Sequence, residues 1–139
     1  FGQAKNESNV FEGDWKVSCK HGSGFIQINK DYSILMEVNS NQIYISCFGI
    51  KKVYDEYQIL EIFLIEPDDL GHGGMNLNWN FFSKNKMIGK LLFNNEYKME
   101  FEWFGFYNDK KKKYEWVDNI DFILSDNKNY PVCLEKCNK

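Results

Sequence analysis

The feature that most constrains the fold of this chain is an alternation of apolar and polar side chains with a period of two residues. In residues 13–20, Trp15, Val17 and Cys19 alternate with lysine and serine, which is the pattern of a strand with one buried face. Clusters of Gly, Asn, Asp and Ser separate this segment from others of the same kind, and such clusters form turns. The chain has a single alanine, the strongest helix former, whereas 17% of its residues are aromatic and favour strands. We therefore expect an all-β protein.

The alternation recurs often enough to predict eight to ten short strands. They are expected over residues 13–20, 25–29, 34–38, 42–48, 53–65, 77–81, 87–93, 96–107, 114–117 and 120–124. Residues 77–81 show the clearest alternation. Residues 53–65 also suit a helix, but their β-branched and aromatic content favours a strand. Residues 66–74 are expected to form a long loop, and the tail from residue 125 is expected to be loop-like or briefly helical.

Strands of this number in a chain of 139 residues predict one closed domain. Closure into an antiparallel up-and-down barrel hides every strand edge, and a β-sandwich is the alternative. We expect residues 1–10 to form an N-terminal extension and residues 125–139 a C-terminal tail. The side chains expected inside the barrel are Trp15, Phe25, Met36, Trp79, Phe81, Met99, Phe101 and Trp103. This bulky set favours a filled interior, although aromatic walls also line ligand cavities.

The four cysteines predict a disulfide-stabilised protein of an oxidising compartment. Their number is even and no Cys-x-x-Cys pair is present, so a zinc or thioredoxin-type site is not indicated. Strand phase favours a bond between Cys19 and Cys47 inside the barrel, which leaves Cys133 to pair with Cys137. The competing arrangement joins the C-terminal cysteines to the early strands. Either arrangement predicts a secreted or periplasmic protein, and the start of the chain, without Met or an apolar leader, predicts a mature, processed form.

The charge of the chain argues against nucleic acid as a partner. The net charge is −3, and arginine, the usual bidentate phosphate ligand, is absent. The basic run of residues 110–113 lies between two aromatic strands and is expected at a solvated hairpin tip. The longest apolar runs are far shorter than the roughly 20 residues that span a bilayer, so no membrane span is expected.

Three groups of residues are candidates for contact with a protein partner. Two lie in glycine-rich loops, and the third is an aromatic run expected to form an exposed patch. They are His21 and Ser23; Asp68, Asp69, His72 and Gly73; and Phe104, Phe106 and Tyr107.

No arrangement of residues in the sequence predicts catalysis, a metal or a cofactor. The second loop has carboxylates and an imidazole that suit a divalent cation, but ligands from one loop without a second cluster are more typical of a polar turn. His21 and Ser23 lack a nucleophile elbow and an orienting acid. Paired carboxylates for glycoside hydrolysis are available at Glu61, Glu66, Asp68, Glu100 and Glu102. Glu100 and Glu102 alternate outward from a strand, which favours a surface role, and we expect a protein that is not an enzyme.

The segment from Phe11 to Trp15 resembles the Gly-x-Trp signature of lipocalins, here at Gly13 and Trp15. Lipocalins are secreted eight-stranded barrels that bind apolar ligands, and the resemblance implies a calycin-like barrel. In that family the tryptophan packs at the closed end of the barrel beneath an arginine from a late strand. This chain has no arginine to fill that position.

The size, disulfide content and acidic balance of the chain also resemble those of small exported barrels that inhibit lysozymes, and of immunity proteins that guard bacteria from cell-wall hydrolases. Some of these inhibitors present a loop with Ser-Gly or His to the enzyme cleft, and the two glycine-rich loops have this character. The first functional hypothesis is therefore an exported, non-catalytic inhibitor or immunity protein that blocks an enzyme through its loops. The alternative is a lipocalin-like carrier of a small apolar ligand.

Overall fold

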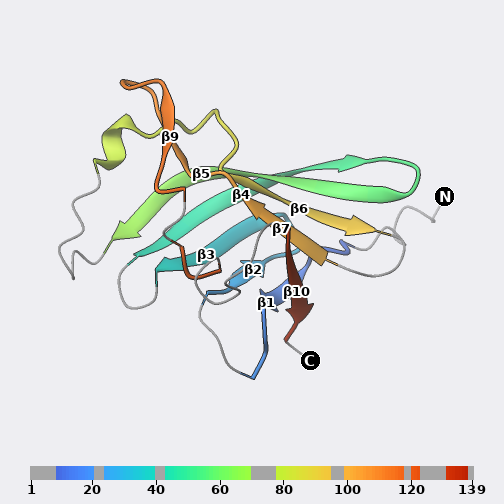
Figure 1. Ribbon diagram of the computed structural model, residues 1–139. Helices are drawn as coiled ribbons and strands as arrows, with labels where there is room; N and C mark the ends of the chain where they lie inside the picture. Colours follow the sequence, from blue (N-terminus) through green and yellow to red (C-terminus); the bar gives the residue numbers. More distant parts are fainter. Residues whose placement is uncertain are drawn as a thin grey trace.

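The chain folds into a closed, eight-stranded antiparallel barrel with the strand order β1-β10-β7-β6-β5-β4-β3-β2 (Figure 1). The computed structural model describes residues 9–20, 24–39, 43–69, 78–94, 99–117, 120–122 and 131–137. The barrel strands are β1 (Gly13–Lys16), β2 (Ile26–Ile28), β3 (Ser33–Asn39), β4 (Ile43–Val53), β5 (Tyr57–Asp69), β6 (Gly89–Asn94), β7 (Met99–Trp103) and β10 (Val132–Lys136). The expectation of an antiparallel all-β barrel is confirmed.

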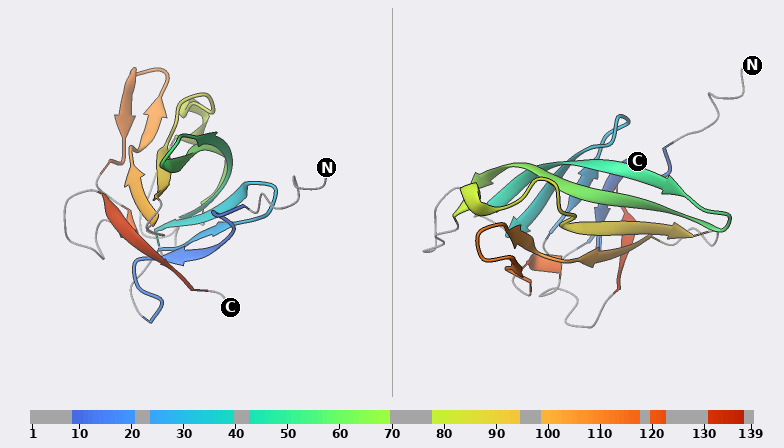
Figure 2. Two further views of the ribbon diagram at one scale, coloured as in Figure 1. Left: turned by 90° about the vertical axis from the view of Figure 1, so that its right-hand side faces the viewer. Right: turned by 90° about the horizontal axis from the view of Figure 1, so that it is seen from above.

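Burial alternates along the strands with the period that the sequence shows. In β3, Ile34, Met36 and Val38 are buried, while Leu35 and Glu37 between them face outward. Side chains on one face of a strand pack into the barrel, and those on the other face meet solvent. The strands curve around a common interior (Figure 2), and the side chains buried there form one apolar core.

The β4–β5 hairpin is the longest element of the barrel. Its strands are joined by eleven registered residue pairs, from Val53 opposite Gln58 to Ile43 opposite Asp69. Strand β3 pairs with β4 only as far as Phe48, so the tip of the hairpin extends beyond β3 (Figure 1). A bulge next to Ser46 and Cys47 adds one residue to β5.

A second, two-stranded sheet consists of β8 (Phe106–Asn108) and β9 (Lys113–Glu115). The buried Asn108 organises its turn, because the side-chain Oδ1 accepts hydrogen bonds from the backbone N–H groups of Lys110 and Lys111, both at 2.9 Å. The lysine run lies exposed in this hairpin, as expected. The Trp103 Nε1–H donates to the Trp116 carbonyl at 3.0 Å and joins the hairpin to the barrel.

The prediction of a strand over residues 77–81 is wrong. Residues Trp79–Phe81 form a 3₁₀-helix instead, and residues before Asn78 lie outside the described part of the chain. The Trp79 ring packs edge-on against Phe82 and Phe106, with ring centroids 5.4 and 5.0 Å away. This packing overrides the alternation, since the neighbouring asparagines have a low preference for strands.

Other elements also differ from expectation, and the strand expected over residues 96–107 is divided into β7 and β8. Strand β1 ends at Lys16 rather than residue 20, and β5 continues through Pro67 to Asp69, where a loop was expected. Asp121 and Phe122 are helical, although a strand was expected over residues 120–124. The tail contains strand β10, which inserts between β1 and β7 and closes the barrel. A tail without strand structure would have left both of those edges open.

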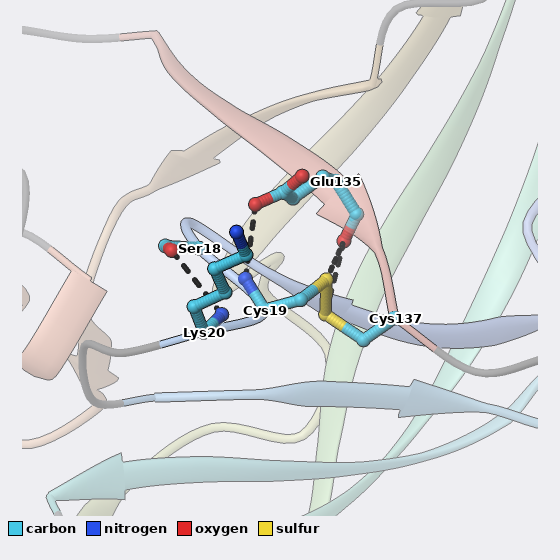
Figure 3. The surroundings of a disulfide bond; sticks show 5 residues. All are labelled: Ser18, Cys19, Lys20, Glu135 and Cys137. Atoms are coloured by element: carbon cyan, nitrogen blue, oxygen red, sulfur yellow. Dashed lines mark hydrogen bonds between the residues drawn. A yellow bond between two sulfur atoms is a disulfide. The ribbon is translucent and has the colours of Figure 1, made fainter.

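One disulfide joins Cys19 to Cys137, with the Cα atoms 5.3 Å apart (Figure 3). The favoured pairing of Cys19 with Cys47 is wrong, because β1 ends before Cys19, which is exposed, while Cys47 is buried inside the barrel. The competing arrangement, in which the C-terminal tail is joined back to the first part of the chain, is confirmed for this one bond, although Cys19 lies in the segment that follows β1 rather than in the strand. Cys47 and Cys133 are free thiols, the second of them exposed, and burial raises the pKa of the Cys47 thiol.

Candidate functional site

One end of the barrel is closed by Phe11, which precedes β1 and is fully buried. The Trp15 Nε1–H donates to the Phe11 carbonyl at 2.8 Å, and the Phe93 ring lies edge-on to the Phe11 ring at 6.4 Å. The Asn9 side chain donates to the carbonyls of Asn29 and Lys30 in the β2–β3 turn. The N-terminal segment is thereby held across this end, and Phe11 fills the space beneath it.

The other end is filled by Phe122, which is also fully buried. Its ring lies 5.0 Å from that of Phe101 on β7. Gly24 lies so close to this ring that a Cβ atom there would come within 3.2 Å of it, and its φ of +89° already favours glycine. Two aromatic side chains therefore fill opposite ends of the barrel.

Most of the predicted interior side chains lie inside. Trp15, Met36, Met99, Phe101 and Trp103 are buried. The prediction is wrong for the three others, which are only half-buried: Phe25, Trp79 and Phe81. The aromatic and branched side chains that occupy the inner positions support a filled interior.

Trp15 has a cation above its ring, although the chain lacks the arginine that a lipocalin places there. The Lys136 Nζ of the last strand, β10, lies 5.9 Å from the ring centroid. This lysine makes a cation–π contact with Trp15 in a chain that has no arginine.

Described residues line two pockets on the outer wall of the barrel. One, with a volume of about 210 Å³, is lined by Lys90, Leu92, Glu100, Phe101, Glu102 and Pro131. The other, of about 300 Å³, is lined by Asp14, Lys16, Phe25, Gln27 and Cys137. Both are open to solvent and lie at or below the lower limit of the usual size of a small-molecule site.

The residues that anchor the two predicted partner loops lie at the same end of the barrel. Asp68 pairs with Tyr44, which pairs with Glu37. The Gly24 N–H donates to the Glu37 Oε1 at 3.0 Å. The end of the first loop is thereby held next to the paired residues Glu37, Tyr44 and Asp68. Four further candidates lie outside the described residues: His21, Ser23, His72 and Gly73.

This end of the barrel is acidic. The Glu37 carboxylate raises the pKa of the Tyr44 hydroxyl, with smaller contributions from burial, Asp121 and Asp68. Asp69 forms the last pair of β5, opposite Ile43. Among the residues that the structure describes, no three His, Cys, Asp or Glu side chains are grouped so that they could hold a metal ion.

The predicted aromatic patch is only partly exposed. Phe106 is fully buried, and the expectation that it faces outward is wrong. It lies at the centre of an aromatic cluster, with its ring 5.0 to 5.2 Å from those of Trp79, Phe82 and Trp103. Phe104 and Tyr107 are half-buried against Tyr114.

The candidate carboxylates lie on the outer wall rather than in a deep cleft. Glu100 and Glu102 face outward from β7 beside Lys90. Glu61 forms an ion pair with Lys52 at 3.4 Å, and Glu66 is exposed. None of these four carboxylates is fully buried.

The outer wall of β3, β4 and β5 carries an apolar surface that the sequence analysis did not single out. We call it the outer apolar patch; it consists of Leu35, Phe48, Ile50, Phe63 and Ile65. The Phe48 and Phe63 rings stack at 5.3 Å with an interplanar angle of 16°. Leu35, Phe48, Ile50 and Ile65 are 36–43% exposed. The β5 bulge contributes to the patch, because Ile65 is the residue that it inserts.

No protein-family model, no curated protein and no solved structure matches this chain. No family is therefore assigned to the chain. Among the described residues, no helix has the length and apolar character needed to span a membrane.

Proposed function

We propose that this chain is an exported, non-catalytic protein that binds another protein, as inhibitors and immunity proteins of secreted hydrolases do. The contact surface is the outer apolar patch. The Cys19–Cys137 disulfide supports export, because such bonds persist in oxidising compartments.

The observation that carries the proposal is the contrast between the inside and the outside of the barrel. The interior positions hold bulky buried side chains, and Phe11 and Phe122 fill the two ends. The outer wall of β3–β5 instead leaves apolar and aromatic side chains in solvent. Exposed apolar side chains that gather on one wall, with two stacked rings among them, are typical of a binding surface. Stacked aromatic rings on a rigid sheet suit a protein interface, because little side-chain entropy is lost when they are covered.

A capture experiment with matched variants tests the proposal. The disulfide-intact protein is immobilised and exposed to culture fluid and lysate of the producing organism, and bound proteins and small molecules are identified by mass spectrometry. Phe48→Ser and Ile50→Ser remove the centre of the patch. Val117→Ser is the control, since Val117 is also exposed (39%) but lies beyond β9.

We expect wild type and the Val117→Ser variant to retain the same protein at equal molar ratio, and both patch variants to lose it. If that protein is a hydrolase, its activity should fall when the wild-type chain is added in excess. Retention that is equal for all four proteins would exclude the patch as the contact surface. Recovery of an apolar small molecule without any protein would favour the carrier function instead.

A further inference from the structure

We infer that the partner is a cationic protein, which covers the outer apolar patch and places basic side chains against an acidic rim beside it. The acidic rim consists of Glu37, Glu66 and Asp68. This inference rests on the proposed function and specifies the chemistry of its partner.

The register of β3, β4 and β5 places the rim directly beside the patch. Ser46 on β4 lies between Leu35 and Glu66, and in the next row Tyr44 lies between Glu37 and Asp68. The side chains from β3 and β4 face the outer side, because the residues that alternate with them are buried, and Glu66 and Asp68 of β5 are exposed opposite them. The wall therefore changes from apolar to acidic within two rows.

The lysines of the same wall do not neutralise this rim. Lys52 is paired with Glu61 at 3.4 Å, and the Lys51 Nζ lies over the Tyr32 ring at 5.7 Å. Both lie at the opposite end of the hairpin from Asp68. Glu66 and Asp68 are exposed, so they attract an oppositely charged surface with little desolvation cost.

A protein fits this combination better than a metal ion does. The rim carboxylates are spread over neighbouring strands, and the described residues contain no group of three that could hold a metal ion. An apolar centre with a charged border is instead the anatomy of a protein interface. The partner that complements it has an apolar centre bordered by lysine or arginine.

The test separates candidate partners by charge before capture. Culture fluid is passed over a carboxymethyl resin at pH 7, and the retained cationic fraction and the unretained fraction are each offered to the immobilised protein. The rim variant is Glu66→Gln with Asp68→Asn. The control is Glu100→Gln with Glu102→Gln, which removes the same charge from the wall of β7.

We expect capture from the cationic fraction, dependence on Phe48, and an association rate at low salt that falls about tenfold in the rim variant but less than twofold in the control. The rate for wild type should also fall with added salt more steeply than that for the rim variant. Phe48-dependent capture from the unretained fraction only, or an unchanged rate in the rim variant, would overturn this inference and leave the proposed function standing. Absence of Phe48-dependent capture from both fractions would overturn the proposed function and this inference with it.

Discussion

Removal of the Cys19–Cys137 disulfide should cost this barrel a large part of its stability. The bond joins residues separated by 118 positions and holds the end of β10 beside the segment that follows β1. Only two registered pairs join β1 to β10, Trp15 with Lys136 and Lys16 with Glu135, so the seam that closes the barrel has few other contacts along the backbone. The Cys19 N–H adds a hydrogen bond to the Glu135 Oε2 at 2.9 Å (Figure 3).

The expected magnitude follows from the length of the closed loop. In the chain-entropy model, cross-linking residues this far apart removes about 16 cal/mol/K from the unfolded chain, which corresponds to about 5 kcal/mol at 25 °C. This is a large fraction of the roughly 5–15 kcal/mol by which domains are stable. With an m-value of about 2 kcal/mol/M, the urea midpoint should fall by about 2.5 M.

The assay is urea unfolding of the Cys19→Ser, Cys137→Ser double variant, followed by the fluorescence of the buried Trp15 and Trp103. Cys133→Ser is the control, because that thiol is exposed and unbonded, and its free energy of unfolding should stay within about 0.5 kcal/mol of wild type. A loss below about 1 kcal/mol in the double variant would refute the reasoning, since the seam would then be held by other contacts.

Three further predictions concern thiol reactivity, the backbone and the β8–β9 turn. A maleimide at pH 8 should label only Cys133 in the native protein, because Cys47 is buried and burial raises the pKa of its thiol. Cys47 should be labelled only after unfolding. Mass spectrometry counts the adducts, and two rapid adducts on the native protein would contradict this prediction. Gly105→Ala should lower the free energy of unfolding by about 1–3 kcal/mol, because Gly105 has a φ of +106° and a Cβ atom there would lie 2.6 Å from the Glu115 carbonyl oxygen. Urea unfolding measures the change, and an unchanged midpoint would contradict this prediction. Asn108→Ala should lower the free energy of unfolding by about 1–3 kcal/mol. It should also raise the pKa of Glu115, because the hydrogen bond from the Asn108 amide holds that pKa below its usual value. NMR titration of Glu115 measures the shift, and an unchanged pKa would contradict the prediction.

The sequence was sufficient to predict most strands and their buried faces, because the alternation in β3 and β4 indicates which side chains enter the core. The barrel itself was predicted from the need to hide the strand edges. Ile34 and Met36 on β3, and Ile43 and Ile45 on β4, are all buried. Strand β10 was missed because only Val132 and Leu134 are apolar in it, and two positions give too short a pattern. What makes this segment a strand is the pairing with β1 and β7, which is a long-range interaction.

The disulfide could not be predicted from strand phase alone. The alternation continues to Cys19, but the strand ends at Lys16, so phase no longer determines on which side of the barrel the sulfur lies. The residue at which a strand ends depends on the strand that pairs with it. Strand β1 pairs with β10, which was not expected from the sequence.

The outer apolar patch was missed for a related reason. Residues 57–65 are apolar on both faces, which is typical of a strand buried on both sides. In a closed barrel one face of β5 is necessarily outside, so Phe63 and Ile65 lie on the surface. Once closure is expected, such a two-faced strand is itself a signal for an exposed apolar surface.

Hydroxyl-radical footprinting of the protein with its captured partner tests the central claim most directly, because the radical labels exposed aromatic and aliphatic side chains. On binding, we expect labelling to fall at Phe48, Ile50 and Phe63 and to stay constant at Val117. Unchanged labelling of Phe48 and Phe63 in a saturated complex would show that the partner binds elsewhere and would contradict the account.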